Sequence, residues 1–193
     1  MNRKSIAAAL ISAALAVGLT ACSSDESPTA APTSAPTTTN AASPFGTDEF
    51  IANRLRKSTT AIVEAVEERG GTPEQALAAL LASQAETAWQ SGLSMPPPAD
   101  GIRDIYGWRF AYNIGADSSD AVRAATQTFM QNAAAVTLKP DDPVAYALAV
   151  QHADPRGYNE KEHFYKFGET AAGQYPKALE KAQAAYDELR DSK

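Results

Sequence analysis

The chain has 193 residues, a formal net charge of −6 at pH 7 and a single cysteine. One cysteine excludes an intramolecular disulfide, and an acidic chain without a basic run is poorly suited to bind nucleic acid. The same charge gives no electrostatic attraction to anionic lipid headgroups.

Residues 1–21 have the pattern of an export signal. A positively charged segment, Asn2-Arg3-Lys4, precedes an apolar segment from Ile6 to Leu19, which is shorter than the about 20 residues needed to span a membrane. The next residues, Leu19-Thr20-Ala21-Cys22, resemble the lipobox of bacterial lipoproteins, in which the cysteine becomes the lipidated N-terminus of the mature protein. The alternative is an ordinary secretory signal followed by an unrelated cysteine.

Lipidation of Cys22 predicts where the protein is held. Two or more acyl chains, such as palmitate, give stable membrane attachment, whereas one chain gives only marginal binding. We therefore expect an exported protein that is anchored to the outer face of the bacterial cytoplasmic membrane. Removal of residues 1–21 takes away Arg3 and Lys4 but no acidic residue, so the formal charge changes from −6 to −8.

Residues 22–45 are predicted to form a flexible tether. The segment from Ser23 to Ser43 is rich in Ser, Thr, Pro and Ala and has no aromatic or large aliphatic residue. Such a segment cannot bury enough apolar surface to offset the conformational entropy lost on ordering. The remaining residues, 46–193, are sufficient for one domain with one hydrophobic core.

Two helices are predicted at the start of this domain. Thr47 can cap the first, which continues to about Arg69. The segment Thr72-Pro73-Glu74-Gln75 begins the second, central helix, because threonine is a favourable N-cap, proline suits the first helical position and glutamine can complete a capping box. The central helix is expected within the stretch from Thr72 to Gly92, and its buried stripe consists of Leu77, Leu80 and Leu81.

The composition changes after the central helix. Three consecutive prolines follow Met95 and exclude a helix there. Residues 102–116 are aromatic and partly alternating, which favours a short hairpin. Further helices are expected at about 118–136, 142–152, 159–172 and 175–193. The predicted fold is therefore mainly α, with five or six helices and a small β or irregular insertion after the central helix.

Two kinds of chemistry have little support in the sequence. Nucleophilic catalysis is disfavoured because the chain has no Gly-x-Ser-x-Gly elbow and its cysteine is predicted to be lipidated. His152 with Asp154, and His163 with Glu160 or Glu162, can be imagined around an ion, but their spacing matches no zinc signature. We therefore expect neither a metal nor another cofactor.

Glu86, near the end of the central helix, is the strongest candidate for a catalytic residue. Glycoside hydrolysis needs a protonated carboxylic acid and often a second carboxylate, and a carboxyl group beside an aromatic residue in a cleft can serve as that acid. At about 100° per residue, Glu86 points about 180° away from Leu77, and Trp89 lies on the same side as Glu86. This orientation fits the wall of a cleft and fits solvent equally well.

Three segments resemble those of bacterial N-acetylglucosaminidases of the flagellar muramidase type. Ala85-Glu86-Thr87-Ala88-Trp89-Gln90-Ser91 is similar to the motif around that family's catalytic glutamate, although Gln90 stands where the family usually has glycine. Tyr112-Asn113-Ile114-Gly115 is similar to the family's Asn-Leu-Phe-Gly segment. His152-Ala153-Asp154-Pro155-Arg156-Gly157-Tyr158 is similar to its closing segment, and His152 replaces the first tyrosine of that segment.

The resemblance implies a lysozyme-like α+β domain that cleaves the glycan strands of peptidoglycan. Glu86 would be the general acid, and Asp104, or else Asp100, would stabilise the transition state or position water. The sugar subsites would be lined by Trp89, Tyr112, Asn113 and Tyr158.

Other interpretations remain open from the sequence alone. A non-catalytic lipoprotein could use the same fold to bind wall glycan or a partner protein, and a helical scaffold without a ligand would carry Glu86 on an open face. The remaining aromatic residues are expected in the core rather than in sugar subsites: Trp108, Phe110, Phe164 and Phe167. For Tyr158 the core and the site are equally good interpretations.

Overall fold

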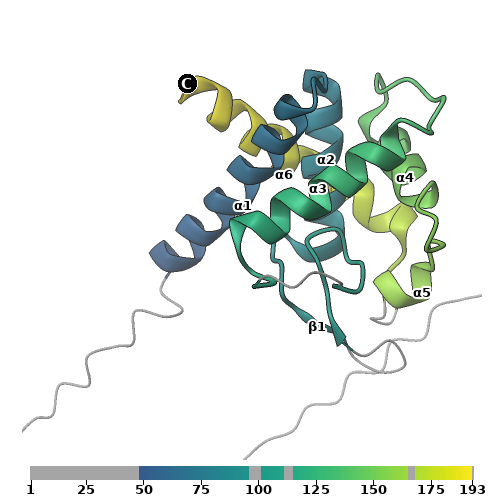
Figure 1. Ribbon diagram of the computed structural model, residues 1–193, viewed down its shortest axis with the longest axis horizontal. Helices are drawn as coiled ribbons and strands as arrows, with labels where there is room; N and C mark the ends of the chain where they lie inside the picture. The colour runs from purple at the N-terminus through teal and green to yellow at the C-terminus, as the bar shows by residue number, and fades with distance from the viewer. Residues whose placement is uncertain (1–47, 96–100, 111–114, 165–167, 193) are drawn as a thin grey trace, which may run out of the picture. The chain divides into compact units, whose positions relative to one another are not determined.

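A computed structural model describes residues 48–95, 101–110, 115–164 and 168–192 (Figure 1). The chain divides into two units, residues 1–41 and 42–193, and every described residue belongs to the second unit. The predicted signal segment and tether, with Cys22, therefore lie outside the described residues. The same holds for Asp100, Tyr112, Asn113 and Phe167.

The described part of the chain is mainly helical, which confirms the predicted class. Its helices are α1 (Asp48–Glu68), α2 (Pro73–Thr87), α3 (Ser119–Ala133), α4 (Pro143–His152), α5 (Glu160–His163) and α6 (Ala171–Asp191). Between α2 and α3, strands β1 (Ser94–Met95) and β2 (Gly101–Ile102) pair antiparallel, with Ser94 opposite Ile102 and Met95 opposite Gly101. An isolated bridge between Arg103 and Arg109 extends this small insertion.

Helix α2 begins as its sequence predicts. The Thr72 hydroxyl accepts a hydrogen bond from the Gln75 backbone amide at 3.3 Å, and the Gln75 side chain accepts one from the Thr72 amide at 3.0 Å. Two of the amides that a helix start leaves without partners are thereby satisfied.

Helix α2 ends at Thr87, within the stretch predicted for the central helix. Ala88 and Trp89 have φ angles of 51° and 61°, in the left-handed region. Their backbone amides donate back to the carbonyl groups of Gln84 and Ser83, so that the last turn is closed although no glycine is present.

Helix α2 is the central element of the domain, since it packs against α6, α4 and α1. Leu80 and Leu81 are fully buried, as predicted, whereas Leu77 is only partly buried. Other sides of the helix are also buried, at Ala76, Ala78, Ala79, Ala82 and Ser83. Because neighbouring elements cover most of the second half of α2, a residue there that points away from the leucines can still be buried, as Glu86 is.

The last two helices also differ from their predicted bounds. The helix expected over 159–172 is the single turn α5, because Phe164 leaves the helical conformation with φ −114° and ψ 77°. Helix α6 then begins at Ala171 rather than at Tyr175, since the Thr170 side chain accepts from the Gly173 amide at 3.1 Å and caps it. Pro176 lies inside this helix.

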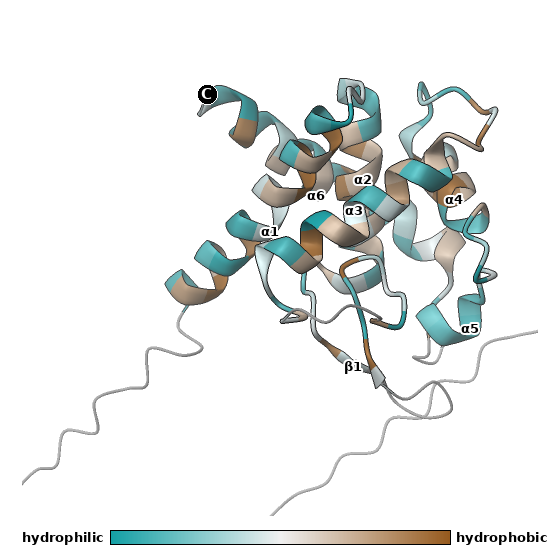
Figure 2. Ribbon diagram, viewed as in Figure 1, coloured by the Kyte–Doolittle hydropathy of each residue, from teal (hydrophilic) through white to brown (hydrophobic). Residues whose placement is uncertain are grey.

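The core joins the helices to the insertion. The ring of Tyr106 stacks on Phe129 of α3 with centroids 4.8 Å apart, and its hydroxyl group is 3.0 Å from the Thr126 hydroxyl. Trp108 and Phe164 are buried, as predicted, and Phe110 is half-buried. Figure 2 shows hydrophilic and hydrophobic stretches alternating along α1 and α3, as expected for helices with one exposed side. None of the described helices combines the length and apolarity that crossing a membrane requires.

Candidate active site

The Glu86 carboxylate lies at the centre of a buried group of polar side chains. Its Oε1 accepts hydrogen bonds from the hydroxyl groups of Tyr158 and Tyr175, each at 2.8 Å, and a longer one from Gln151 Nε2 at 3.4 Å. Its Oε2 is 2.8 Å from Nδ1 of His163. With Glu86 ionised, the Nδ1–H of His163 donates to Oε2. We call these five residues the Glu86 cluster.

Four segments of the chain bring the partners of Glu86 to the end of α2. Gln151 comes from α4, Tyr158 from the loop that follows, His163 from the end of α5, and Tyr175 from α6. Gln151 also links the cluster to the insertion, because its amide donates to the Tyr106 carbonyl at 3.0 Å. The same side chain accepts the indole N–H of Trp108 at 2.7 Å.

Gly107 gives the cluster its space. Its φ angle is +80°, a conformation that favours glycine. A Cβ atom at this position would lie 2.8 Å from His163 Nδ1 and 3.0 Å from Glu86 Oε2. The insertion can therefore approach the carboxylate and the imidazole this closely only where residue 107 has no side chain.

The two tyrosines act as donors in this arrangement. Burial raises the pKa of Tyr158 and of Tyr175 well above the ordinary value, and the negative charge of Glu86 raises both further. Both phenols therefore keep their protons and direct them at Glu86. Hydrogen bonds to a charged acceptor offset the cost of burying that charge.

The carboxylate of Glu86 has no access to solvent. The exposed fraction of its side chain is 0%, while the whole residue is 6% exposed, so the exposed part is main chain. A general acid has to bring its proton to the leaving oxygen within about 3 Å. In this conformation the Glu86 cluster can hold a buried charge and orient His163, but it does not present a proton to a substrate.

A pocket of about 360 Å³ lies beside the cluster, at the end of α2. We call it the α2-end pocket. Its wall contains three glutamines, Gln84, Gln90 and Gln174, together with Arg103 and Glu169. Glu86 and His163 are the members of the Glu86 cluster that line it, and the remaining lining residues are Ala85, Thr87, Ala88, Leu93 and Phe164.

The carboxamide of Gln84 has an unusual environment. Its Oε1 atom is buried, and no donor among the described residues reaches it. A buried acceptor without a partner costs about 1 to 3 kcal/mol in folding free energy. Such a cost in the wall of a pocket calls for an explanation other than stability.

Asp104 lies in a buried turn and does not line the α2-end pocket. Its Oδ1 accepts the backbone amides of Tyr106 and Trp108 at 2.8 Å and 3.0 Å, which closes the turn between the two aromatic residues. Burial raises the pKa of Asp104 to about 7, against the opposing effects of these hydrogen bonds and of the charge on Arg156. The carboxyl group that the resemblance suggested as the second carboxylate thus has its Oδ1 engaged in a buried turn.

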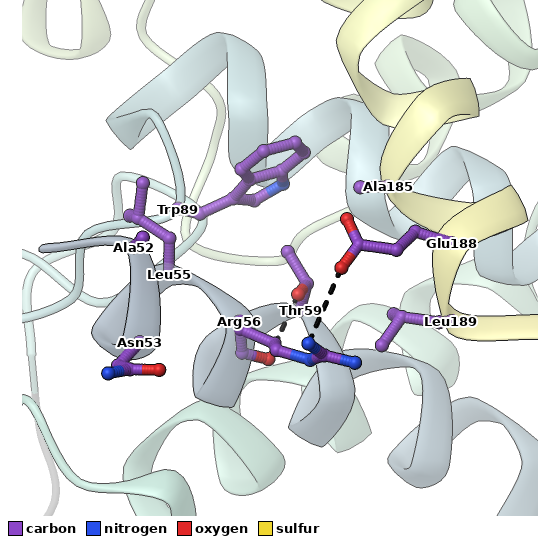
Figure 3. A pocket seen from close by; sticks show the side chains of 9 residues that line it. All are labelled: Ala52, Asn53, Leu55, Arg56, Thr59, Trp89, Ala185, Glu188 and Leu189. Atoms are coloured by element: carbon purple, nitrogen blue, oxygen red, sulfur yellow. Dashed lines mark hydrogen bonds and ion pairs between the residues drawn. The ribbon is translucent and has the colours of Figure 1, made fainter. Parts of the chain in front are cut away.

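Trp89 does not lie with Glu86. The prediction that the two residues share a helix face is wrong, because α2 ends at Thr87 and the spacing of three residues no longer places them on one side. The indole N–H of Trp89 donates to the Leu80 carbonyl at 2.9 Å, and its ring lines a different pocket, between α1 and α6 (Figure 3).

The closing segment of the resemblance contributes one member of the Glu86 cluster. Tyr158, which the sequence left between core and site, is half-buried and bonded to Glu86, and its ring packs edge-on against His152 with centroids 4.7 Å apart. Asp154 is held by Arg156 at 2.7 Å and by Asn132 at 2.8 Å. Within the described ranges, no group of three or more acidic, histidine or cysteine side chains is placed to hold a metal ion.

Sequence analysis missed three members of the cluster: Gln151, His163 and Tyr175. They lie 65, 77 and 89 residues from Glu86. The sequence suggested His163 only as a possible ligand of an ion, whereas the residue is 4% exposed and bonded to Glu86. A tyrosine in the first turns of the last helix was the available signal for Tyr175, but nothing local relates it to Glu86.

Comparisons of the chain with protein-family models, with curated proteins and with solved structures gave no match. The resemblance of the segments around Glu86, Gly115 and Tyr158 to wall-degrading glucosaminidases therefore rests on the motifs quoted above.

Proposed function

We propose that this is a membrane-anchored lipoprotein of the bacterial envelope whose lysozyme-like domain binds the glycan strands of peptidoglycan in the α2-end pocket. The observation that carries the proposal is the chemistry of this pocket beside the Glu86 cluster. The lipobox at Cys22 and the tether that follows support the location.

Three neutral amides, those of Gln84, Gln90 and Gln174, contribute to the polar wall of the pocket. A glutamine carboxamide both donates and accepts hydrogen bonds, which matches the hydroxyl and N-acetyl groups of wall sugars. Leu93 and Phe164 add apolar surface for the faces of sugar rings. The volume, about 360 Å³, is at the lower end of the range of about 300 to 1,000 Å³ that is usual for ligand pockets and suits a short segment of a glycan strand.

The charges in the wall do not favour an ionic ligand. Arg103 donates to the carbonyl groups of Glu162 and His163, at 3.0 Å and 3.2 Å, and so has a structural task of its own. Glu169 adds one half-buried carboxylate. The whole chain is acidic, which disfavours polyanionic wall polymers as ligands.

Binding is tested with Gln84→Met, which removes a carboxamide of the pocket while nearly keeping its volume. The full chain is titrated with a soluble oligosaccharide of peptidoglycan glycan, and we expect the Kd to rise about tenfold, the equivalent of about 1.4 kcal/mol. Gln183→Met, on the exposed side of α6, is the matched control and should leave the Kd unchanged. An unchanged Kd in Gln84→Met would count against this pocket.

Hydrolysis of the strand is a second candidate function. The observation that favours it is the 2.8 Å hydrogen bond between Tyr158 and Glu86. These two residues are 72 positions apart and belong to two different segments of the resemblance. In that reaction Glu86 would pass a proton to the glycosidic oxygen, and water would add to the sugar carbon and return a proton to the protein. The burial of the carboxylate requires that the site opens first.

The two functions differ in one measurement. A hydrolase releases reducing ends from purified peptidoglycan, and Glu86→Gln abolishes this release. A binding protein releases no reducing ends. The fraction of the wild-type chain that is bound to peptidoglycan is then the same at early and late times. Binding without release by the wild type excludes the hydrolase and leaves the binding function standing.

A further inference from the structure

A second pocket, of about 320 Å³, lies on another side of the domain and shares no lining residue with the α2-end pocket. We call it the Trp89 pocket (Figure 3). Helix α1 lines it with Ala52, Asn53, Leu55, Arg56 and Thr59, helix α6 lines it with Ala185, Glu188 and Leu189, and Trp89 comes from the turn after α2.

Trp89 is fixed in the wall of this pocket. Its indole N–H is bonded to the Leu80 carbonyl at 2.9 Å, so the orientation of the ring is set. Trp89 and the preceding Ala88 both have left-handed backbone conformations, which cost about 1 to 2 kcal/mol for each residue other than glycine. Such strain persists only where the surroundings impose it, and here it places a half-buried aromatic ring against the pocket.

The pocket combines an aromatic and aliphatic floor with a polar rim of zero net charge. Leu55 and Leu189 line the pocket with Trp89, and Figure 3 shows Leu55 on the side of Trp89 and Leu189 across the pocket, beside Glu188. At the rim, Arg56 and Glu188 form an ion pair with N and O atoms 3.6 Å apart, and both side chains are more than half exposed. An exposed pair of this kind is weak, so each partner is able to exchange it for a ligand hydroxyl group.

These features specify a class of ligand. A zero-charge rim gives no advantage to a phosphate or a carboxylate, and a purely apolar ligand would leave Arg56, Glu188 and the carboxamide of Asn53 without new partners. A pyranose ring presents an apolar face of C–H groups and an edge of hydroxyl groups, which match the aromatic ring and the polar rim respectively.

We propose that the Trp89 pocket is a second saccharide-binding site, which takes a neutral N-acetylhexosamine unit with its apolar face on the ring of Trp89. This site would bind the same class of ligand as the α2-end pocket, but the two pockets have no lining residue in common. Two separate sites would let the domain hold a glycan strand, or two strands, at two points, and avidity then exceeds the affinity of either site.

The test observes the indole N–H signals of the two tryptophans by NMR in the full chain, assigned with a Trp89→Phe variant. The probe is a β-1,4-linked tetramer of N-acetylglucosamine. We expect the Trp89 signal to shift in a saturable manner. The shift should persist in Gln84→Met, which separates this site from the α2-end pocket.

Two further variants locate the binding. Ala52→Phe fills the Trp89 pocket from an exposed position on α1 and should weaken the saccharide affinity read from Trp89 by at least about tenfold. Ala184→Phe adds the same ring on the exposed side of α6, outside the pocket, and should have no effect. The proposal is overturned if the Trp89 signal does not move, if Ala52→Phe leaves the affinity unchanged, or if a wall stem peptide without sugar shifts the signal and the saccharide does not.

Discussion

At the level of single residues, the buried carboxylate of Glu86 depends on several hydrogen-bond partners rather than on one. Two phenols, an imidazole and a carboxamide surround the carboxylate. A hydrogen bond to a charged group contributes about 1.5 to 3 kcal/mol, and a buried group left without its partner loses its full desolvation cost. Each donor therefore has a measurable share in the stability of the fold.

Replacement of Tyr175 by phenylalanine removes one donor and should lower the free energy of unfolding by about 1.5 to 3 kcal/mol. Tyr158→Phe should cost less, because Tyr158 is half-buried and water can replace its hydroxyl group, whereas Tyr175 is completely buried. Urea unfolding measures both changes. Tyr186→Phe, which removes only the long 3.3 Å contact with Arg190, is the control and should stay within about 0.5 kcal/mol. Equal effects of all three variants would contradict the role given to the cluster.

Asp104 predicts a pH dependence of stability. Burial raises its pKa to about 7 from 3.8, so between about pH 4 and pH 7 the folded chain holds a proton that the unfolded chain has released. The free energy of unfolding therefore falls as the pH rises through this window, by up to about 1.4 kcal/mol per pH unit from this group.

Asp104→Asn keeps the acceptor for the two backbone amides and removes the titration. The free energy of unfolding of this variant minus that of the wild type should be larger at about pH 8 than at about pH 5. Urea unfolding of both chains at the two pH values measures the difference. A difference that does not change with pH would show that Asp104 does not titrate in this window.

At the level of elements, the start of α2 was predictable and its end was not. Thr72, Pro73 and Gln75 form a local signal that fixes the first turn. The end has no glycine or asparagine, and the left-handed residues there are Ala88 and Trp89. The hydrogen bond from the Trp89 indole to the Leu80 carbonyl accompanies this conformation, and no local sequence signal indicates it. The helix predicted over 159–172 failed for a similar reason, because the burial of Phe164 outweighs local helical preference.

The strained end of α2 predicts that a change from alanine to glycine stabilises the fold at Ala88 and destabilises it at Ala184. Ala88→Gly relieves a left-handed alanine at an exposed position and should raise the free energy of unfolding by about 1 kcal/mol. Ala184→Gly, at an exposed position inside α6, should lower it by about 0.5 to 1 kcal/mol. Thermal or urea unfolding compares the two, and a loss of stability in both would contradict the strain at Ala88.

At the level of the whole molecule, the chain joins a lipid anchor predicted at Cys22 to a helical domain that carries the α2-end pocket and the Trp89 pocket. Anchoring predicts that the wild-type chain sediments with bacterial membranes, and that Cys22→Ser is found in the soluble fraction. Immunoblotting of the two fractions measures this distribution. Cys22→Ala serves as a second variant, and retention of both variants on the membrane would show that another feature holds the protein there.

The sequence identified part of the site. Glu86 and Tyr158 could be selected because local motifs surround them, and the structure brings them within 2.8 Å. His163 and Tyr175 could not be selected, since their role arises only when α5 and α6 fold back on α2. The place of Trp89 was mispredicted because it depends on the residue at which α2 ends.

The binding claim is tested most directly by the side-chain amide signals of the glutamines in an NMR titration of the full chain with a soluble peptidoglycan oligosaccharide. We expect saturable shifts of the carboxamide signals of Gln84, Gln90 and Gln174, all in the α2-end pocket. The signal of Gln183, exposed on α6 and bonded to Asp187 at 2.9 Å, should stay in place. Unchanged signals of the three pocket glutamines at a high concentration of the oligosaccharide would show that the α2-end pocket does not bind it.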